Sequence, residues 1–215
     1  MQGNAMKNSS KDIKTLTTDI FTANSSSVLA NPYYAQDERI LIELFKQYPS
    51  NKKSDHIFHK IVMVDFIYST QLKRLIGESG IHDLAQRISE INFDSRIKIG
   101  DTTLVNEIAG ATSKNLFSFA SKYCALHNRF VSQKDDYSIY DRTVAKLFPQ
   151  YTKLVNKVDS SIVIVKEAQI EKWRKAKSYQ EFNDAIGGFL DKCNISELDF
   201  PNRRMKFDEF LWNQR

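Results

Sequence analysis

Two residues in the middle of the chain have types and a spacing that suit chemistry at a sugar carbon. Lys122 and Asp141 are nineteen positions apart. On a helix drawn at 100° per residue from Leu116, one arc holds Phe117, Phe119, Ala120, Tyr123, Cys124 and Leu126. Lys122 falls just beyond the edge of this arc. Partial desolvation there would lower its pKa, which an amine nucleophile requires.

Asp141 follows the apolar pair Ile139-Tyr140 and precedes a helical pattern, so we expect it at the N-terminus of a helix. A carboxylate there is held by backbone N–H groups and stays ionised. If the loop returns antiparallel, the amine can form a Schiff base at C1′ while the carboxylate stabilises an oxocarbenium-like centre. Two ordinary interpretations stay open: Lys122 as a snorkelling surface residue and Asp141 as a cap alone.

The elements that must position this pair are helical. The chain has 215 residues, enough for one domain of two lobes, and 41% are hydrophobic and 27% charged. Only 7 glycines and 4 prolines argue against a sandwich or barrel, which needs turn residues at each strand junction. Helical spacing recurs throughout, so we predict an all-α fold of roughly eight to ten helices.

The expected helices are 32–48, 55–69, 81–91, 102–109, 115–127, 139–147, 166–193 and 207–212. The helix at 55–69 is apolar almost all round and is expected to be the central buried one. Gly77 and Gly80 should interrupt the chain before residue 81, and Gly187-Gly188 should break the helix at 166–193. Residues 162–165 have the composition of a short strand.

The predicted domain organisation has two parts. Residues 1–31 are expected to form a polar N-terminal arm, partly flexible, with at most one helix. Residues 32–215 are expected to form a single helical domain of two lobes with a cleft between them.

Composition excludes several protein classes. No window holds 18 apolar residues, so we expect no membrane span, and the start lacks a secretory signal. The two cysteines cannot form a disulfide framework, which indicates a reduced, cytoplasmic protein. His56 and His59 lack a third ligand, so no metal is expected. The net charge of +5 permits a polyanionic partner without demanding one.

The segment SFASKYC, with the aspartate of YSIYDRTV nineteen positions after its lysine, resembles the helix-hairpin-helix-GPD superfamily of DNA glycosylases. The likeness is greatest to 8-oxoguanine glycosylases with AP lyase activity and to their uncharacterised bacterial relatives. The resemblance implies a two-lobed helical fold, with Lys122 attacking C1′ of the damaged nucleotide and Asp141 assisting. It implies no metal and no cofactor.

The resemblance also implies DNA contacts. FIYSTQLKRL resembles the place where these enzymes fill the gap left by the flipped base. Substrate-binding roles would fall to Tyr68, Ser69, Thr70, Gln71 and His127, and phosphate contacts to Lys73, Arg74, Ser118 and Ser121. The closing FDEFLW and its Trp212 are expected to pack. Ser118 and Ala120 replace two family glycines, so the hairpin is degenerate and a tight phosphate approach is in doubt.

The function predicted from these residues is a monomeric, bacterial, nucleoid-associated glycosylase and AP lyase. It would remove an oxidised purine, 8-oxoguanine being favoured, from double-stranded DNA through a lysine Schiff base. One alternative is a catalytically inactive DNA-binding module of the same fold. Another is a helical protein-interaction domain, which predicts a cleft without basic lining.

Overall fold

The protein is all-α in the part of the chain that its computed structural model describes, residues 19–23 and 31–214. Those residues form ten labelled helices and a helical segment at 19–23, and no strand. The helices are α2 (Pro32–Gln47), α3 (Ser54–Tyr68), α4 (Leu72–Glu90), α5 (Phe93–Lys98), α6 (Thr103–Ala109), α7 (Phe117–Phe130), α8 (Arg142–Asn156), α9 (Glu167–Ala176), α10 (Tyr179–Lys192) and α11 (Arg203–Asn213). The predicted fold class is confirmed.

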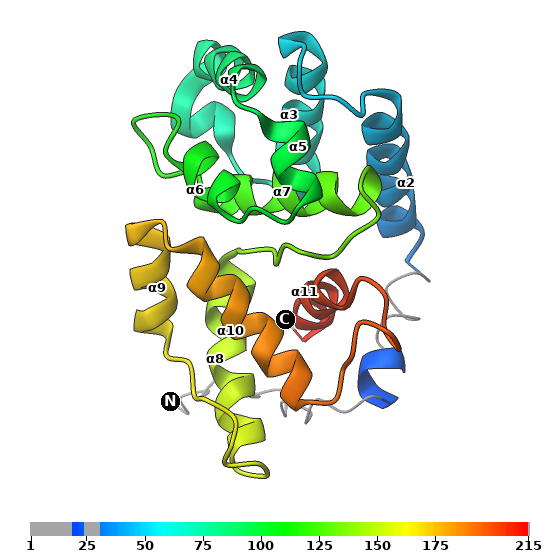
Figure 1. Cartoon of the computed structure of the whole chain (residues 1–215), viewed down its shortest axis with the longest axis vertical. Helices are drawn as coiled ribbons and strands as arrows, with labels where there is room; N and C mark the ends of the chain where they lie inside the picture. Colours follow the sequence, from blue (N-terminus) through cyan, green and yellow to red (C-terminus); the bar gives the residue numbers. More distant parts are fainter. Residues whose placement is uncertain (1–18, 24–30, 215) are drawn as a thin grey trace, which may run out of the picture.

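The helices gather in two groups along the long axis (Figure 1). One group holds α2 to α7 and the other holds α8 to α11, and the extended segment from α7 to α8 runs between them. The chain therefore passes once from the first group to the second just before Asp141. None of the described helices is long and apolar enough to cross a lipid bilayer.

The predicted N-terminal arm is only partly described. Residues 1–18 and 24–30 lie outside the described residues, as does Arg215. In the helical segment at 19–23, Phe21 is fully buried, with its ring centroid 5.3 Å from that of Phe200 and 6.4 Å from that of Phe210. This segment therefore packs onto the group that contains α11.

The most deeply buried helix is α7, not the helix that the sequence favoured. Twelve of its 14 residues are buried, and it packs against α2, α3, α5 and α6. The prediction that α3 is the central helix is wrong, since Phe66 is 79% exposed and Val62 is 41% exposed. An all-round apolar composition shows that a helix can be buried, but the neighbours decide which face is covered.

The predicted strand at 162–165 is also wrong. These residues form an irregular connection to α9, although Ile162 and Val165 are buried. Side chains of α8 take the place of a partner strand: the amide of Val165 donates to Thr152 Oγ1 at 3.1 Å, and Asn156 Nδ2 donates to the Ile162 carbonyl at 2.7 Å. These contacts supply hydrogen-bond partners to backbone groups of the connection, so no neighbouring strand is needed.

One predicted glycine break is confirmed and one is wrong. Gly77 has a φ of +71° and interrupts the helical backbone inside α4. Gly187 lies within α10, and the chain instead breaks between α9 and α10 at Lys177, with a φ of 54°. A Cβ on Gly187 would lie 2.5 Å from Arg204 Nη2, so this glycine leaves room for a guanidinium.

A buried amine fixes the loop between α2 and α3. Lys60 is fully buried, and its Nζ donates to the carbonyls of Tyr48 at 3.0 Å and Ser50 at 3.3 Å and to Asn51 Oδ1 at 2.9 Å. Asn51 is held in turn by Asp94, which accepts from its amide at 2.9 Å. This network ties the loop to α3 and α5 through acceptors that would otherwise be unpaired.

Burial lowers the pKa of Lys60 to about 7, and this generates a prediction. An unfolded lysine titrates near about 10.4, so the unfolded state binds more protons than the folded state between these values. The free energy of unfolding should therefore rise between about pH 7 and about pH 10. Urea unfolding gives the free energy of unfolding of the wild type and of Lys60→Met at each pH. Over this range the value for the wild type should rise relative to the value for Lys60→Met. Parallel pH profiles would contradict the assignment, and the exposed Lys52→Met is the control.

Candidate active site

The structure brings Lys122 and Asp141 together. Lys122 Nζ lies 3.9 Å from Asp141 Oδ2, and the two residues are 1% and 7% exposed. Asp141 is the N-cap of α8, and its Oδ1 accepts from the amide of Val144 at 2.8 Å. The predicted place of Asp141 at a helix start is confirmed, and an arrangement of the two side chains on opposite faces is excluded.

The amine of Lys122 is held by three further contacts. Its Nζ donates to the carbonyl of Tyr140 at 3.0 Å and to Ser118 Oγ at 3.1 Å, and it lies 5.8 Å from the ring centroid of Tyr68. Burial lowers the pKa of Lys122, while the charge of Asp141 opposes this effect. Desolvation is what activates a lysine nucleophile, and the neighbouring carboxylate works against this effect.

The second oxygen of Asp141 contacts the end of the chain. Trp212 Nε1 on α11 donates to Asp141 Oδ2 at 2.7 Å. The expectation that FDEFLW only packs is therefore wrong, because Trp212 is 40% exposed and orients the carboxylate next to Lys122. An indole is a donor without an acceptor, so it fixes Asp141 as a hydrogen-bond acceptor.

A cavity of about 760 Å³ opens beside the pair, and we call it the lysine pocket. Most residues that the sequence placed at the site line it together. Its lining is Tyr68, Ser69, Thr70, Gln71, Ser118, Lys122, Asp141, Arg142, Thr143, Lys146, Leu147, Trp212 and Gln214. Arg142 and Lys146 add positive charge to the lining, and the sequence analysis did not single them out.

The turn from α3 to α4 presents its side chains to the lysine pocket from a strained backbone. Ser69 and Gln71 are in the left-handed region, with φ of 50° and 62°. Asp65 stabilises the turn, since its Oδ1 accepts from Thr70 Oγ1 at 2.6 Å and from the amide of Leu72 at 2.9 Å. Left-handed conformations at non-glycine residues persist only where the surroundings enforce them, and they concentrate at functional sites.

Two predicted site residues are buried away from the lysine pocket. His127 is 1% exposed, with its Nε2 2.7 Å from Asn51 Nδ2, and burial lowers its pKa to about 3. Ser121 is fully buried, and its Oγ accepts from the amide of Tyr140 at 3.0 Å. Both side chains fix the packing of α7. The predictions that His127 contacts the substrate and that Ser121 contacts a phosphate are therefore wrong, because neither side chain lines the lysine pocket.

The two basic residues at the start of α4 lie outside the lysine pocket lining. Lys73 and Arg74 are exposed, and Lys73 Nζ is 3.4 Å from Glu78 Oε2. They come two and three positions after Gln71 along the chain. Their phosphate contacts stay a prediction.

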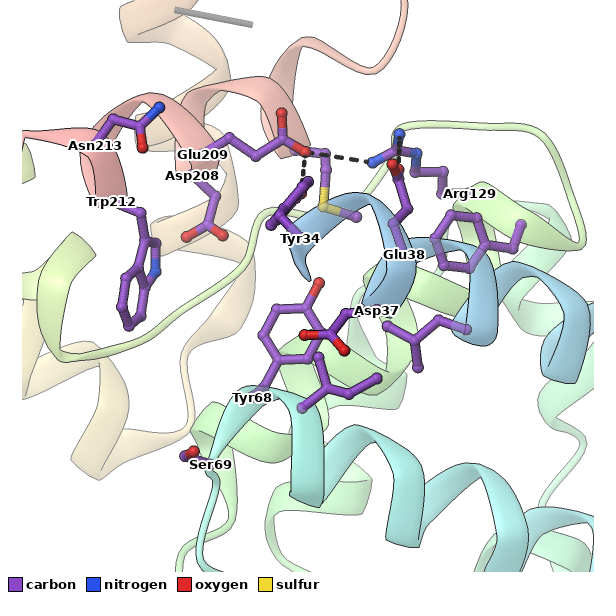
Figure 2. A pocket seen from close by; sticks show the side chains of 14 residues that line it. Tyr34, Asp37, Glu38, Tyr68, Ser69, Arg129, Asp208, Glu209, Trp212 and Asn213 are labelled. Atoms are coloured by element: carbon purple, nitrogen blue, oxygen red, sulfur yellow. Dashed lines mark hydrogen bonds and ion pairs between the residues drawn. The ribbon is translucent and has the colours of Figure 1, made fainter. Parts of the chain in front are cut away.

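A second cavity of about 510 Å³ adjoins the first, and we call it the acidic pocket (Figure 2). The two pockets share Tyr68, Ser69 and Trp212. The acidic pocket has carboxyl groups from α2 and α11, namely Asp37, Glu38, Asp208 and Glu209. Arg129 is the basic residue in its lining, so the lining is rich in hydrogen-bond acceptors.

Helices α2, α7 and α11 meet at the rim of the acidic pocket. Tyr34 donates to Glu209 Oε1 at 2.5 Å, and Arg129 Nη2 lies 2.7 Å from Glu38 Oε1. Arg129 Nη1 is also 3.8 Å from Glu209 Oε1. Figure 2 shows these contacts as a chain of dashed lines. They join the two groups of helices across one side of the pocket.

Asp208 is the functional group that sequence reasoning missed most clearly. It is 6% exposed and lines the acidic pocket, and its Oδ1 has no hydrogen-bond partner among the described residues. Burial, and then the charge of Asp141, raise the pKa of Asp208 well above its usual value. Its sequence context, an aspartate in an amphipathic helix, gave no signal of burial. In the described part of the chain, no group of three or more His, Cys, Asp or Glu side chains is placed to hold a metal ion.

The charge of Asp141 generates a prediction for Lys122. Because Asp141 raises the pKa of Lys122 against the effect of burial, Asp141→Asn should lower it further. The lysine Cε resonance that disappears in Lys122→Gln can be followed against pH in ¹³C-lysine-labelled protein. We expect its midpoint to move to lower pH in Asp141→Asn and to stay unchanged in the exposed control Asp184→Asn. An unchanged midpoint in Asp141→Asn would show that the carboxylate does not act on the amine.

Comparisons with known proteins place the chain in a family. An uncharacterised protein of Haemophilus influenzae is 31% identical over 138 residues, which are 62% of this chain and 57% of that protein. The chain thus spans little more than half the length of this relative. No solved structure matches the chain. The family model HI_0787_N, which describes an N-terminal domain, matches residues 13–135, more than half of the 215 residues. The chain therefore belongs to the HI_0787_N family.

Proposed function

We propose that the protein is a DNA repair glycosylase with AP lyase activity, which acts on an oxidised purine in duplex DNA. The observation that carries this proposal is the buried amine of Lys122, 3.9 Å from the Asp141 carboxylate at a cavity of about 760 Å³. A nucleophilic amine and a fixed anion are the two groups that Schiff-base chemistry at C1′ needs.

In this proposal each member of the pair has one task. Lys122 attacks C1′ as the bond to the base breaks, and the resulting amine adduct opens the sugar to an imine. The carboxylate of Asp141, oriented by Val144 N–H and Trp212 Nε1–H, stabilises the positive charge that develops on the sugar. Loss of a C2′ proton from the imine then eliminates the 3′ phosphate, which is the lyase step.

The acidic pocket suits an extruded purine. It adjoins the lysine pocket through Tyr68 and Trp212, which offer aromatic surface for stacking. Its carboxyl groups are acceptors that match the donor groups of a guanine edge. Oxidation at C8 adds an N7–H donor to guanine, so this chemistry supports 8-oxoguanine as the favoured substrate.

Basic residues near the lysine pocket supply contacts to the DNA backbone in this proposal. Arg142 and Lys146 line the pocket, and Lys73 and Arg74 follow the α3–α4 turn. Neutralisation of phosphates by such residues contributes much of the affinity of DNA-binding proteins. Ser118 stands where the related hairpin has glycine. Its hydroxyl accepts a hydrogen bond from Lys122, so in this proposal the side chain holds the amine, and the backbone does not approach a phosphate closely at this position.

Borohydride trapping tests the proposal directly. The protein is incubated with labelled duplexes that carry 8-oxoguanine, uracil or an abasic site, the reductant is added, and covalent complexes are separated on a denaturing gel. We expect a complex with the wild type on the abasic and 8-oxoguanine duplexes. It should be absent in Lys122→Gln and retained in Lys153→Gln, which removes an exposed lysine of α8 outside the pocket lining.

The remaining outcomes separate the alternatives. A complex that persists in Lys122→Gln would assign the chemistry to another amine. No complex on any duplex, with salt-dependent binding to DNA, would replace the glycosylase by an inactive DNA-binding module. No complex and no binding would favour a protein-interaction domain.

A further inference from the structure

One buried acid at the candidate site has no role in the chemistry described so far. Asp208 lines the acidic pocket from α11, with its carboxyl turned toward the interior and Trp212 nearby on the same helix (Figure 2). Its Oδ1 has no hydrogen-bond partner among the described residues, although the side chain is almost fully buried. A buried polar atom without a partner is costly, and one aimed into a cavity indicates a bound ligand group as its partner.

Titratable groups from several elements interact with Asp208 electrostatically. Lys122 of α7 and Asp141 at the start of α8 interact with it electrostatically, as does Tyr68 of α3. Glu209, the next residue of α11, adds a further negative charge. Two acidic neighbours and burial outweigh the one lysine, so the pKa of Asp208 is raised.

The two aspartates near Lys122 are therefore different chemically. Asp141 accepts one hydrogen bond on each oxygen, from Val144 N–H and Trp212 Nε1–H, so both of its oxygens have a donor. Asp208 lacks such donors at Oδ1 and is surrounded by negative charge. The two carboxyl groups therefore differ in their surroundings, because one is held by two donors and the other has an oxygen without a partner at a cavity.

We propose that Asp208 is the general acid that protonates the departing base. This inference rests on the proposed glycosylase function and adds a catalytic residue to it. As the nitrogen lone pair of Lys122 forms the bond to C1′, the glycosidic C–N bond breaks and its electron pair stays on the base. The O–H proton of Asp208 moves to that base, which leaves as a neutral molecule.

The proton that Asp208 gives to the base is replaced without any added reagent. After base departure the adduct nitrogen of Lys122 carries a positive charge and an extra proton, and Asp208 is a carboxylate. Transfer of that proton from the adduct nitrogen to Asp208, directly or through a water, restores the carboxylic acid and leaves a neutral amine on C1′. Asp141 takes no part in these proton transfers and acts through its charge.

The experiment compares two substrates that differ in whether a base must leave. Single-turnover release of base is measured on an 8-oxoguanine duplex, and borohydride trapping is measured on an abasic duplex. For Asp208→Asn we expect base release to fall about 100-fold or more, because general acids contribute about 100- to 10,000-fold. Trapping on the abasic duplex should be unchanged. Asp184→Asn, an exposed acid on α10, should alter neither rate.

The two proposals fail in different ways. Unchanged base release by Asp208→Asn, with trapping intact, would overturn the role of Asp208 and leave the glycosylase standing. Equal losses of base release and abasic trapping would mean that Asp208 acts on folding or on Lys122, and would also overturn it. Absence of trapping by the wild type would remove the proposed function itself, and the general acid with it.

A spectroscopic measurement tests the acid without any substrate. The infrared difference spectrum of wild type minus Asp208→Asn at neutral pH should contain the carbonyl band of a protonated carboxylic acid. That band should disappear at alkaline pH as Asp208 ionises. A carboxylate band in its place at neutral pH would contradict the proposal even if Asp208→Asn were inactive.

Discussion

The burial of one amine sets the arrangement of the whole site. Lys122 lies in a helix that is covered on almost every side, so its charge has to be compensated by groups from other elements. Tyr140 and Asp141, in the segment that leads to α8, supply a carbonyl at 3.0 Å and a carboxylate at 3.9 Å. The connection between α7 and α8 must therefore return along α7, and this return joins the two groups of helices seen in Figure 1.

Asp141 serves both structure and electrostatics. One oxygen caps α8 and the other accepts from Trp212, so the carboxylate links the start of one helix to the end of another. An anion held this firmly cannot rotate away when a positive charge forms nearby, which is what preorganised stabilisation requires. Asp208, one turn before Trp212 on α11, has an oxygen without a hydrogen-bond partner among the described residues, and burial raises its pKa. Two chemically identical side chains near Lys122 thus have different surroundings, one held by two donors and one buried at a cavity.

The parts of the site that could be predicted from the sequence are those set by local rules. Asp141 precedes a helix that needs a cap, and Lys122 sits at the border of an apolar arc, so the local position of each followed from its neighbours, whereas their pairing in one site followed mainly from the family resemblance. Trp212 and Asp208 were missed because Trp212 lies 71 residues from its partner Asp141, and no local pattern of α11 records that contact. The preference for α3 over α7 as the central helix failed for a related reason. Burial depends on which elements surround a helix. On α7 the polar residues Lys122, Ser121 and Asn128 are buried because backbone groups outside the helix are their hydrogen-bond partners.

The family match and the chemistry cover different parts of the chain. The matched residues, 13–135, include Lys122 and the strained turn of Ser69 and Gln71, but they end before Asp141 and Asp208. Without the second group of helices, the buried amine would lose its carbonyl and carboxylate partners, and an unpaired buried charge is strongly destabilising. The amine of Lys122 and the groups that act on its charge are therefore divided between the two halves of the described structure. The rim contact from Tyr34 on α2 to Glu209 on α11 joins the same two halves, so the packing of α11 against the first group decides whether the three titratable residues form one site.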